Sequence, residues 1–230
     1  GLPLTDPIWS LAEDGEGRLW VGTASTLLFL EPGAEFPRKV PDASVLMRAV
    51  IDLAVDPAGR PWLLTPRGIG RLSGWNGSDP VFEDFGARLG LPAGAGQHLL
   101  FDREGRLWTN RWRIDPEGIR ADSIGRADGL DIGSVEPGSG SLAENGLIYF
   151  GGTRGLLIVD PAHYRPWPYE PPLVITTLEI DGIAQPVPAA GQPLRVPAEY
   201  RSLAIEFSAL DYSAPEAIRY AYRLGGADAD

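Results

Sequence analysis

Short runs of alternating apolar and other residues recur along the first two thirds of the chain. Runs such as residues 8–13 (IWSLAE) and 50–55 (VIDLAV) fit strands, because successive side chains of a strand point to opposite faces. Each run leads into Asp-x-x-Gly, a turn signal, since Asp can bond its own backbone and Gly tolerates positive φ. A second apolar run follows the turn, so each segment predicts a β-hairpin.

This hairpin pattern repeats at a nearly constant spacing. Copies lie at residues 14–23, 56–65 and 102–110, with a degenerate fourth copy at 144–152. One aromatic residue marks each copy, and the marks are 42, 46 and 41 residues apart: Trp20, Trp62, Trp108 and Tyr149. A period of about 42 residues leaves room for four short strands, the content of one β-propeller blade. We interpret these aromatics as structural residues that pack between blades rather than as sugar-stacking platforms.

The repeat ends near residue 161, where the composition changes. The proline-rich segment 166–172 predicts an extended linker. Beyond it, residues 173–180, 200–210 and 218–224 alternate as strands do, and Asp181-Gly182 predicts a hairpin turn. We therefore expect an all-β fold: about four propeller blades over residues 1–165, part of a larger propeller, and the start of an immunoglobulin-like β-sandwich over 166–230. That second domain is shorter than a complete sandwich of about 100 residues, so strands are missing or come from a partner molecule.

Composition and charge exclude several classes of function. The net charge of −11 argues against nucleic-acid binding and gives no support for binding anionic membrane surfaces. The absence of cysteine excludes disulfides and thiolate metal sites. The sequence shows neither a signal peptide nor a transmembrane run, so we expect membrane attachment only through flanking segments.

Catalytic and metal-binding patterns are missing from the sequence. His98 and His163 are far apart in sequence and lack a nearby acid cluster. Each Asp-x-x-Gly turn offers too few oxygen ligands for calcium. No nucleophile elbow or Ser-His-Asp spacing is found. We therefore expect no catalytic residue, no metal and no cofactor, and a propeller lyase or hydrolase is the least favoured function.

Arginines after the second predicted strand form the candidate binding site. Arg67 and Arg154 both lie five residues past the repeat aromatic, and Arg111, Trp112 and Arg113 occupy the corresponding region of the third copy. Loops on one face of a rigid scaffold commonly bind ligands, and guanidinium groups suit a carboxylate or polyhydroxylated ligand. We predict that these five residues bind a carbohydrate or another small polar ligand. Solvated or turn-capping arginines are the alternative.

Three stretches resemble a known family arrangement. Gly-Leu-Pro followed by Ile-x-x-Leu-x-x-Asp-x-x-Gly-Arg-Leu-Trp-Val-Gly-Thr, within residues 1–23, resembles the two-component regulator propeller repeat. Residues 146–161 resemble the last repeat of such arrays. Residues 171–182 and 207–225 are similar to the Y_Y_Y domain that follows those propellers, with its signature at Tyr212, Tyr220 and Tyr222.

The resemblance implies a periplasmic sensor region of a bacterial signal-transduction protein, and not an enzyme. Such a region binds a ligand or partner and relays the signal towards a membrane-linked cytoplasmic output module. That module is a histidine kinase, a diguanylate cyclase or a DNA-binding regulator. A structural or dimerisation module without its own ligand is the alternative, and exposed strand edges favour a homodimer or self-association. The stimulus, the output module, the blade number and the oligomeric state stay open.

Overall fold

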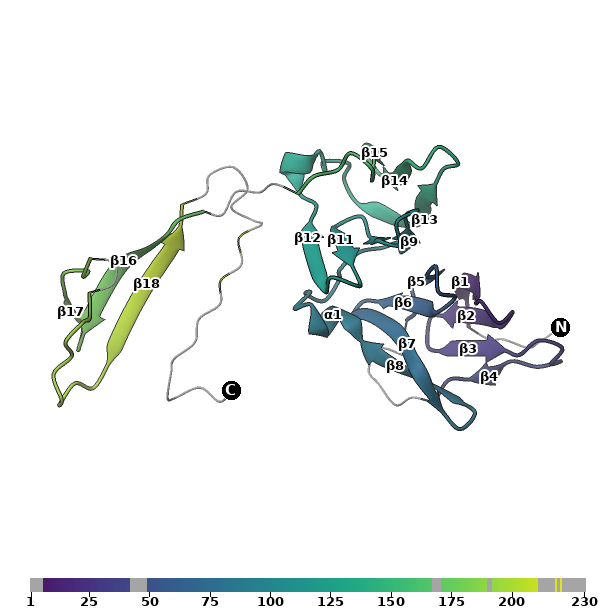
Figure 1. Ribbon diagram of the computed structural model, residues 1–230, viewed down its shortest axis with the longest axis horizontal. Helices are drawn as coiled ribbons and strands as arrows, with labels where there is room; N and C mark the ends of the chain where they lie inside the picture. The colour runs from purple at the N-terminus through teal and green to yellow at the C-terminus, as the bar shows by residue number, and fades with distance from the viewer. Residues whose placement is uncertain are drawn as a thin grey trace. The chain divides into compact units, whose positions relative to one another are not determined.

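The computed structural model describes residues 6–41, 49–166, 171–189, 192–210, 218 and 220. The chain divides into two compact units, Gly1–Pro166 and Trp167–Asp230. Strands in small antiparallel sheets dominate both units, which confirms the all-β prediction (Figure 1).

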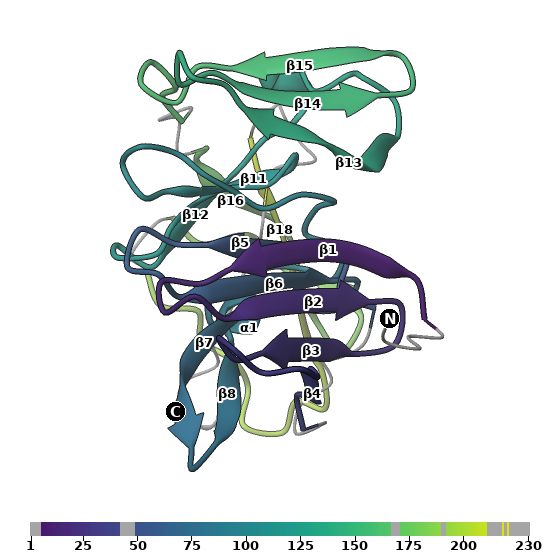
Figure 2. The same cartoon turned by 90° about the vertical axis from the view of Figure 1, so that its right-hand side faces the viewer.

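Within the described residues, unit 1 contains four antiparallel sheets, called blades 1 to 4 in chain order (Figure 2). Blade 1 contains β1 (Ile8–Glu13), β2 (Leu19–Thr23), β3 (Leu27–Leu30) and β4 (Arg38–Lys39). Blade 2 contains β5 (Asp52–Val55), β6 (Pro61–Thr65), β7 (Gly68–Asn76) and β8 (Asp79–Asp84), followed by the short helix α1 (Phe85–Arg88). Blade 3 contains β9 (Leu100–Phe101), β10 (Leu107–Trp108), β11 (Trp112–Asp115) and β12 (Arg120–Ser123), followed by the 3-10 turn η2 (Arg126–Asp128). Blade 4 contains β13 (Val135–Leu142), β14 (Ile148–Gly152) and β15 (Gly155–Val159).

The predicted Asp-x-x-Gly hairpins are confirmed in the first three blades. In blade 1, Asp14 Oδ1 accepts the backbone N–H groups of Glu16 and Arg18, and Gly17 has a φ of 78°. This positive φ is available to glycine at little cost, so the turn can close between β1 and β2. The turns that start at Asp56 and Asp102 repeat the same contacts.

The first strands of the blades lie side by side, since β1 contacts β5, β5 contacts β9 and β9 contacts β13. The blades therefore share one orientation, and unit 1 has two different faces. The Asp-x-x-Gly turns and the equivalent Ala143–Gly146 turn lie on one face, here called the turn face. The loops between second and third strands, together with the connections from blade to blade, lie on the opposite face, here called the loop face.

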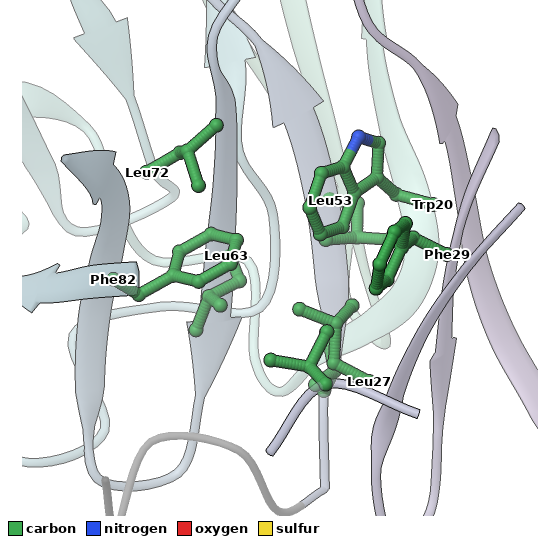
Figure 3. Packing of buried hydrophobic residues seen from close by; sticks show 9 residues of the cluster. Trp20, Leu27, Phe29, Leu53, Leu63, Leu72 and Phe82 are labelled. Carbon is green, nitrogen blue, oxygen red and sulfur yellow. The ribbon is translucent and has the colours of Figure 1, made fainter. Parts of the chain in front are cut away.

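The hydrophobic core lies between successive blades. Figure 3 shows Trp20, Leu27 and Phe29 of blade 1 facing Leu53, Leu63, Leu72 and Phe82 of blade 2. A second cluster joins blades 2 and 3 and is formed by Trp62, Leu64, Ile69, Phe85, Ala95, Leu99, Leu107, Trp112 and Ile114. A third joins blades 3 and 4 and is formed by Trp108, Ile124, Ile132, Ile148, Phe150, Leu157 and Val159. Each interface thus buries one repeat tryptophan, and all three are 0% exposed: Trp20, Trp62 and Trp108.

Each of these tryptophans also donates a hydrogen bond to the Asp of its own turn. The distances from indole Nε1 to carboxylate Oδ2 are 2.9 Å in blade 1, 3.1 Å in blade 2 and 2.7 Å in blade 3. The Asp therefore satisfies a buried polar group as well as closing the turn. The repeat pattern contains this pair as Asp followed six residues later by Trp, but the sequence analysis assigned the Asp to the turn alone.

Tyr149 has the repeat position in blade 4 but is only half-buried. It pairs with Ile158, which is 55% exposed, on the blade face turned away from blade 3. The fully buried aromatic of this blade is Phe150, whose side chain points to the other face and into the cluster with blade 3. Packing of Tyr149 between two blades, expected from the repeat, is not seen among the described residues.

The segment after β15 covers the tryptophan of blade 3. The ring of Tyr164 meets Trp108 edge to face at 5.2 Å between centroids, and Arg106 Nη2 donates to the Pro161 carbonyl at 3.0 Å. Burial, together with the Asp128 and Asp122 carboxylates, raises the pKa of Tyr164 to about 12, and Arg113 offsets part of this effect. The phenol therefore stays neutral where an ordinary tyrosine, with a pKa of about 10, ionises.

We expect unit 1 to lose stability in alkali as Tyr164 ionises. The pKa is raised in the folded state, so the stabilisation is complete below pH of about 10 and is lost as the pH rises towards about 12. The test is a titration of tyrosinate absorbance for the native chain and for Tyr164→Phe, which should lack one late-ionising group. A difference curve with its midpoint near pH 10 would contradict the expectation.

Unit 2 contains one three-stranded antiparallel sheet among the described residues. Its order is β17 (Ile183–Ala184), β16 (Leu173–Ile180) and β18 (Leu203–Ala209). Ile180 pairs with Ile183 across Asp181-Gly182, and both turn residues have positive φ, so the predicted hairpin turn is confirmed. Tyr220 accepts a hydrogen bond from the Ala209 N–H through its hydroxyl at 3.0 Å, whereas Tyr212 and Tyr222 lie outside the described residues. The sandwich and the Y_Y_Y assignment stay predictions.

Candidate functional site

The loop face carries a hollow of about 520 Å³. Three kinds of segment line it: the connection from blade 2 to blade 3, the connection from blade 3 to blade 4, and the loops after the second strands of blades 3 and 4. The charged and amide side chains in this lining are Gln97, Asn110, Arg111, Arg126, Asp131 and Arg154. We call this set the arginine pocket.

The five predicted ligand-binding residues do not form one site. Arg111 and Arg154 both line the arginine pocket, whereas Arg67 is exposed in the loop of blade 2 and does not line it. Trp112 is 9% exposed and belongs to the core cluster between blades 2 and 3. Arg113 lies next to it in β11, and its Nη1 donates to Asp122 Oδ2 of β12 at 2.6 Å. Core packing and ion pairing account for these two side chains.

Arg111 is positioned by a hydroxyl turn that all three complete repeats share. Thr109 Oγ1 accepts the N–H groups of Arg111 and Trp112, as Thr65 Oγ1 accepts those of Arg67 and Gly68. In blade 3 the threonine follows the tryptophan directly, so β10 is short and the turn begins two residues earlier than in blades 1 and 2. Thr109 therefore takes the place that Thr23 and Thr65 have in blades 1 and 2.

Asn110 lines the arginine pocket with a side chain whose orientation is fixed. Its Oδ1 accepts the backbone N–H of Gln97 at 2.7 Å, and this donor fixes which end of the amide is oxygen. Thr109 Oγ1 also donates to the Ala95 carbonyl at 2.8 Å, which holds the connection from blade 2 against the loop. Gly96 has no room for a side chain, because a Cβ there would lie 2.6 Å from Cβ of Thr109. The floor of the pocket is therefore closely packed.

Arg154 is held by contacts between the β14–β15 turn and the connection from blade 3. Its backbone N–H donates to the Ile132 carbonyl at 2.9 Å, and the Thr153 N–H donates to the Ser134 carbonyl at 2.9 Å. Gly133 has a φ of 77°, and a Cβ there would lie 2.3 Å from Thr153 Oγ1, so only glycine allows this approach. The Arg154 guanidinium donates to Asp131 Oδ1 at 2.6 Å.

Arg126 is the one arginine of the pocket that was not predicted from the sequence, and Gln97, Asn110 and Asp131 were not predicted either. Arg126 opens η2 in the connection between blades 3 and 4, where Gly125 N–H donates to Asp128 Oδ2 at 2.9 Å. The residue lies outside the repeated pattern, so comparison of the repeats could not have identified it. A signal in the sequence was segment 125–133 (GRADGLDIG), in which three charged residues stand among three glycines.

The arginine pocket has the opposite charge to the whole chain. Three arginines face one aspartate in the lining, an excess of two positive charges, whereas the chain carries a net charge of −11. Within the described part of the chain, neither Arg111 nor Arg126 has a hydrogen-bonded or ion-paired side-chain partner. Guanidinium groups left free in a hollow are suited to bind an anionic or strongly polar ligand.

A second group of polar residues near the inner strands has the composition of a hydrolytic triad but not its hydrogen bonds. His98 is buried, with Nε2 at 3.2 Å from Ser139 Oγ and Nδ1 at 3.8 Å from Asp52 Oδ2. However, His98 Nε2 also lies 2.9 Å from the Glu136 carbonyl, which can only accept, so this nitrogen carries the proton. A protonated Nε2 cannot remove the hydroxyl proton of Ser139, as a triad requires. We interpret the group as a structural link between blades 2, 3 and 4.

His163, the second histidine of the chain, lies next to Asp160 at the surface. His163 Nδ1 lies 2.7 Å from Asp160 Oδ2, a contact that lowers the pKa of the exposed Asp160 carboxyl. Over the described ranges, no three His, Asp or Glu side chains gather where they could hold a metal ion. No helix in the described part of the chain is long and apolar enough to cross a membrane.

Comparisons with known proteins agree with the propeller-like geometry. Residues 1–25 match the family model of the two component regulator propeller. No curated protein matches the chain. Among solved structures, the chain is similar to the extracellular domain of a hybrid two component system from B. thetaiotaomicron, with 22% identity and a TM-score of 0.56 over 90% of this chain. It is also similar to a streptogramin B lyase, with 16% identity and a TM-score of 0.50 over 69% of this chain.

These structural likenesses show the fold alone, because the identities are low. The chain spans 30% of the length of the two component system domain and 56% of that of the lyase. The similarity to an enzyme shows that this architecture also supports catalysis, but no catalytic residue is transferred by it. The lack of enzymatic activity expected for this chain stays a prediction.

Proposed function

We propose that the chain is the sensor region of a bacterial signal-transduction protein, located outside the cytoplasm, and that the arginine pocket binds a small polar ligand. The match to the two component regulator propeller and the likeness to an extracellular sensor domain support the sensor role. The observation that carries the binding role is the convergence of Arg111, Arg126 and Arg154 on one hollow of the loop face.

In this proposal unit 2 receives the signal from unit 1 and passes it towards a membrane-linked output module. The order along the chain supports this direction, since unit 2 follows unit 1. The location is the periplasm, and the ligand is a carbohydrate or another small polar compound.

A binding screen tests the proposal. We expect the melting temperature of the purified chain to rise with at least one compound in a panel of neutral and acidic mono- and oligosaccharides and small polar metabolites. Saturation at about a hundred times Kd stabilises a protein by roughly 2.7 kcal/mol, a shift of several degrees for a domain of this size. Arg111→Gln should reduce the shift by about half or more, because a tenfold weaker Kd roughly halves the stabilisation at the same ligand concentration. Arg67→Gln, which changes an exposed arginine outside the pocket, should retain the full shift. A panel without any shift would contradict the proposal.

The second candidate function is an assembly module without its own ligand. Exposed apolar side chains on the outer faces of blades 1 and 4 favour it: Ile8, Trp9, Leu11, Leu156 and Ile158 are each about half-exposed. Apolar surface of this kind marks contact with another protein when it is contiguous. Molecular mass in solution, measured with and without the panel compounds, separates the two functions, because an assembly module associates regardless of them.

A further inference from the structure

We infer that the arginine pocket binds a small organic carboxylate. In the absence of ligand Asp131 pairs with Arg154, and the ligand carboxylate replaces Asp131 in this ion pair. This inference rests on the proposed ligand-binding function and names its ligand class.

The charges in the lining require a counter-charge. Arg111, Arg126 and Arg154 come from three different segments, yet all three border the same hollow. Like charges that border one hollow repel each other, and the repulsion is stronger beside a protein surface than in bulk water. Asp131 neutralises one of the three, so two positive charges are left for a ligand.

The size and the neutral donors of the pocket favour an organic molecule over a bare inorganic anion. A volume of about 520 Å³ falls within the roughly 300–1,000 Å³ of ordinary small-molecule sites. The amide nitrogen of Asn110 adds a neutral donor that is fixed by the Gln97 N–H. A planar guanidinium can bind both oxygens of a carboxylate at once, so a carboxylate attached to a polar body uses all of these groups.

The ion pair between Asp131 and Arg154 can be exchanged for a ligand. Its nitrogen–oxygen distance is 2.6 Å, but the two side chains are 64% and 65% exposed. An ion pair so accessible to water contributes little to stability, and breaking it costs little. The Asp131 carboxylate contacts the guanidinium through one nitrogen–oxygen pair, so a ligand carboxylate that binds both oxygens can replace it. The backbone contacts at Ile132 and Ser134 hold the β14–β15 turn in place during the exchange.

The closing experiment is isothermal titration of the 230-residue chain with D-glucuronate, D-glucose, succinate and sulfate. Glucuronate and glucose share a ring and differ in the carboxylate, whereas succinate carries carboxylates without a ring. We expect at least one of the two acids to bind at least about tenfold more tightly than glucose and sulfate, with affinity that falls as salt is added.

Four variants assign the residues. Arg111→Gln and Arg126→Gln should each weaken binding of the acid by about tenfold, and the matched control Arg67→Gln should leave it unchanged. Asp131→Asn should tighten binding several-fold, because Arg154 loses its competitor and the pocket gains a positive charge. If the ion pair between Asp131 and Arg154 were only structural, Asp131→Asn would change the melting temperature without tightening binding. Circular dichroism verifies that each variant is folded.

The outcomes separate this inference from the proposed function. The carboxylate inference is overturned if glucose or another neutral compound binds the Arg111→Gln and Arg126→Gln variants as tightly as it binds the native chain. That outcome leaves the sensor proposal intact. If sulfate binds as tightly as both acids, the inference that the ligand is organic is wrong. If Asp131→Asn leaves the affinity for the acid unchanged, the inference that the ligand replaces Asp131 on Arg154 is wrong. No binding of either acid at about 10 mM overturns the ligand class, whereas the wider panel decides the sensor proposal.

Discussion

Replacing Trp62 by alanine is expected to lower the free energy of unfolding of unit 1 by about 3–5 kcal/mol. The side chain is 0% exposed and packs edge to face against Phe85 at 4.9 Å and Phe101 at 5.6 Å between centroids. Because Phe85 follows blade 2 and Phe101 belongs to blade 3, truncation opens a cavity in the interface between the blades. It also removes the indole donor of the buried Asp56 carboxylate. Urea unfolding followed by circular dichroism measures the loss.

Tyr149→Ala is the matched control, since Tyr149 has the same repeat position in blade 4. It is half-buried and has the exposed Ile158 beside it, so truncation should cost about 1 kcal/mol or less. Equal losses for the two variants would show that burial between blades does not determine the contribution of the repeat aromatic.

The difference between these two positions shows how far the sequence predicts the fold. The hairpins are local: alternation, Asp and Gly within ten residues are enough to specify strand, turn and strand, and the structure has them in register. The environment of an aromatic depends on the neighbouring sheet. Tyr149 and Trp62 occupy one position of the pattern, but only Trp62 has a described blade on both sides.

The same distinction applies to the arginine pocket. Arg111 and Arg154 lie in loops that the repeat defines, so their shared face follows from the strand order. Trp112 lies in the core and does not line the pocket, because β10 is short and Trp112 is therefore the first residue of β11. Arg126 lies in a connection without a counterpart in the other repeats, and its approach to Arg111 depends on tertiary structure.

The two faces of unit 1 differ in how their loops are used. On the turn face, the hairpin turns contact each other: Gly15 N–H donates to the Gly59 carbonyl at 3.0 Å, and Arg103 donates to the Glu144 carbonyl. A Cβ on Gly15 would lie 2.9 Å from the Gly59 Cα, so little space is left there. The loop face instead leaves a hollow lined with charged side chains. The hairpin turns of the turn face are thus packed against each other, whereas the loop face leaves space at its surface.

Asp102→Asn is expected to destabilise unit 1 almost as much as Asp102→Ala, by about 3–5 kcal/mol. The carboxylate is buried and accepts four hydrogen bonds. Oδ1 accepts the backbone N–H groups of Glu104 at 2.9 Å and Arg106 at 3.0 Å. Oδ2 accepts Arg106 Nε–H and Trp108 Nε1–H, both at 2.7 Å. Every acceptor position of the carboxylate therefore faces a donor.

An asparagine at this position cannot satisfy these donors in either orientation. Its amide nitrogen would face two N–H groups, which would then lack an acceptor. Leaving a buried donor without an acceptor costs the full free energy of desolvation of that group. The matched control is Glu104→Gln in the same turn, because Glu104 pairs with Arg106 at 2.8 Å but is 61% exposed and should contribute less than about 1 kcal/mol. Thermal and urea unfolding of the three variants give the comparison. An asparagine variant as stable as the native chain would show that the turn requires only the size of the side chain, and not a buried acceptor for the tryptophan and the arginine.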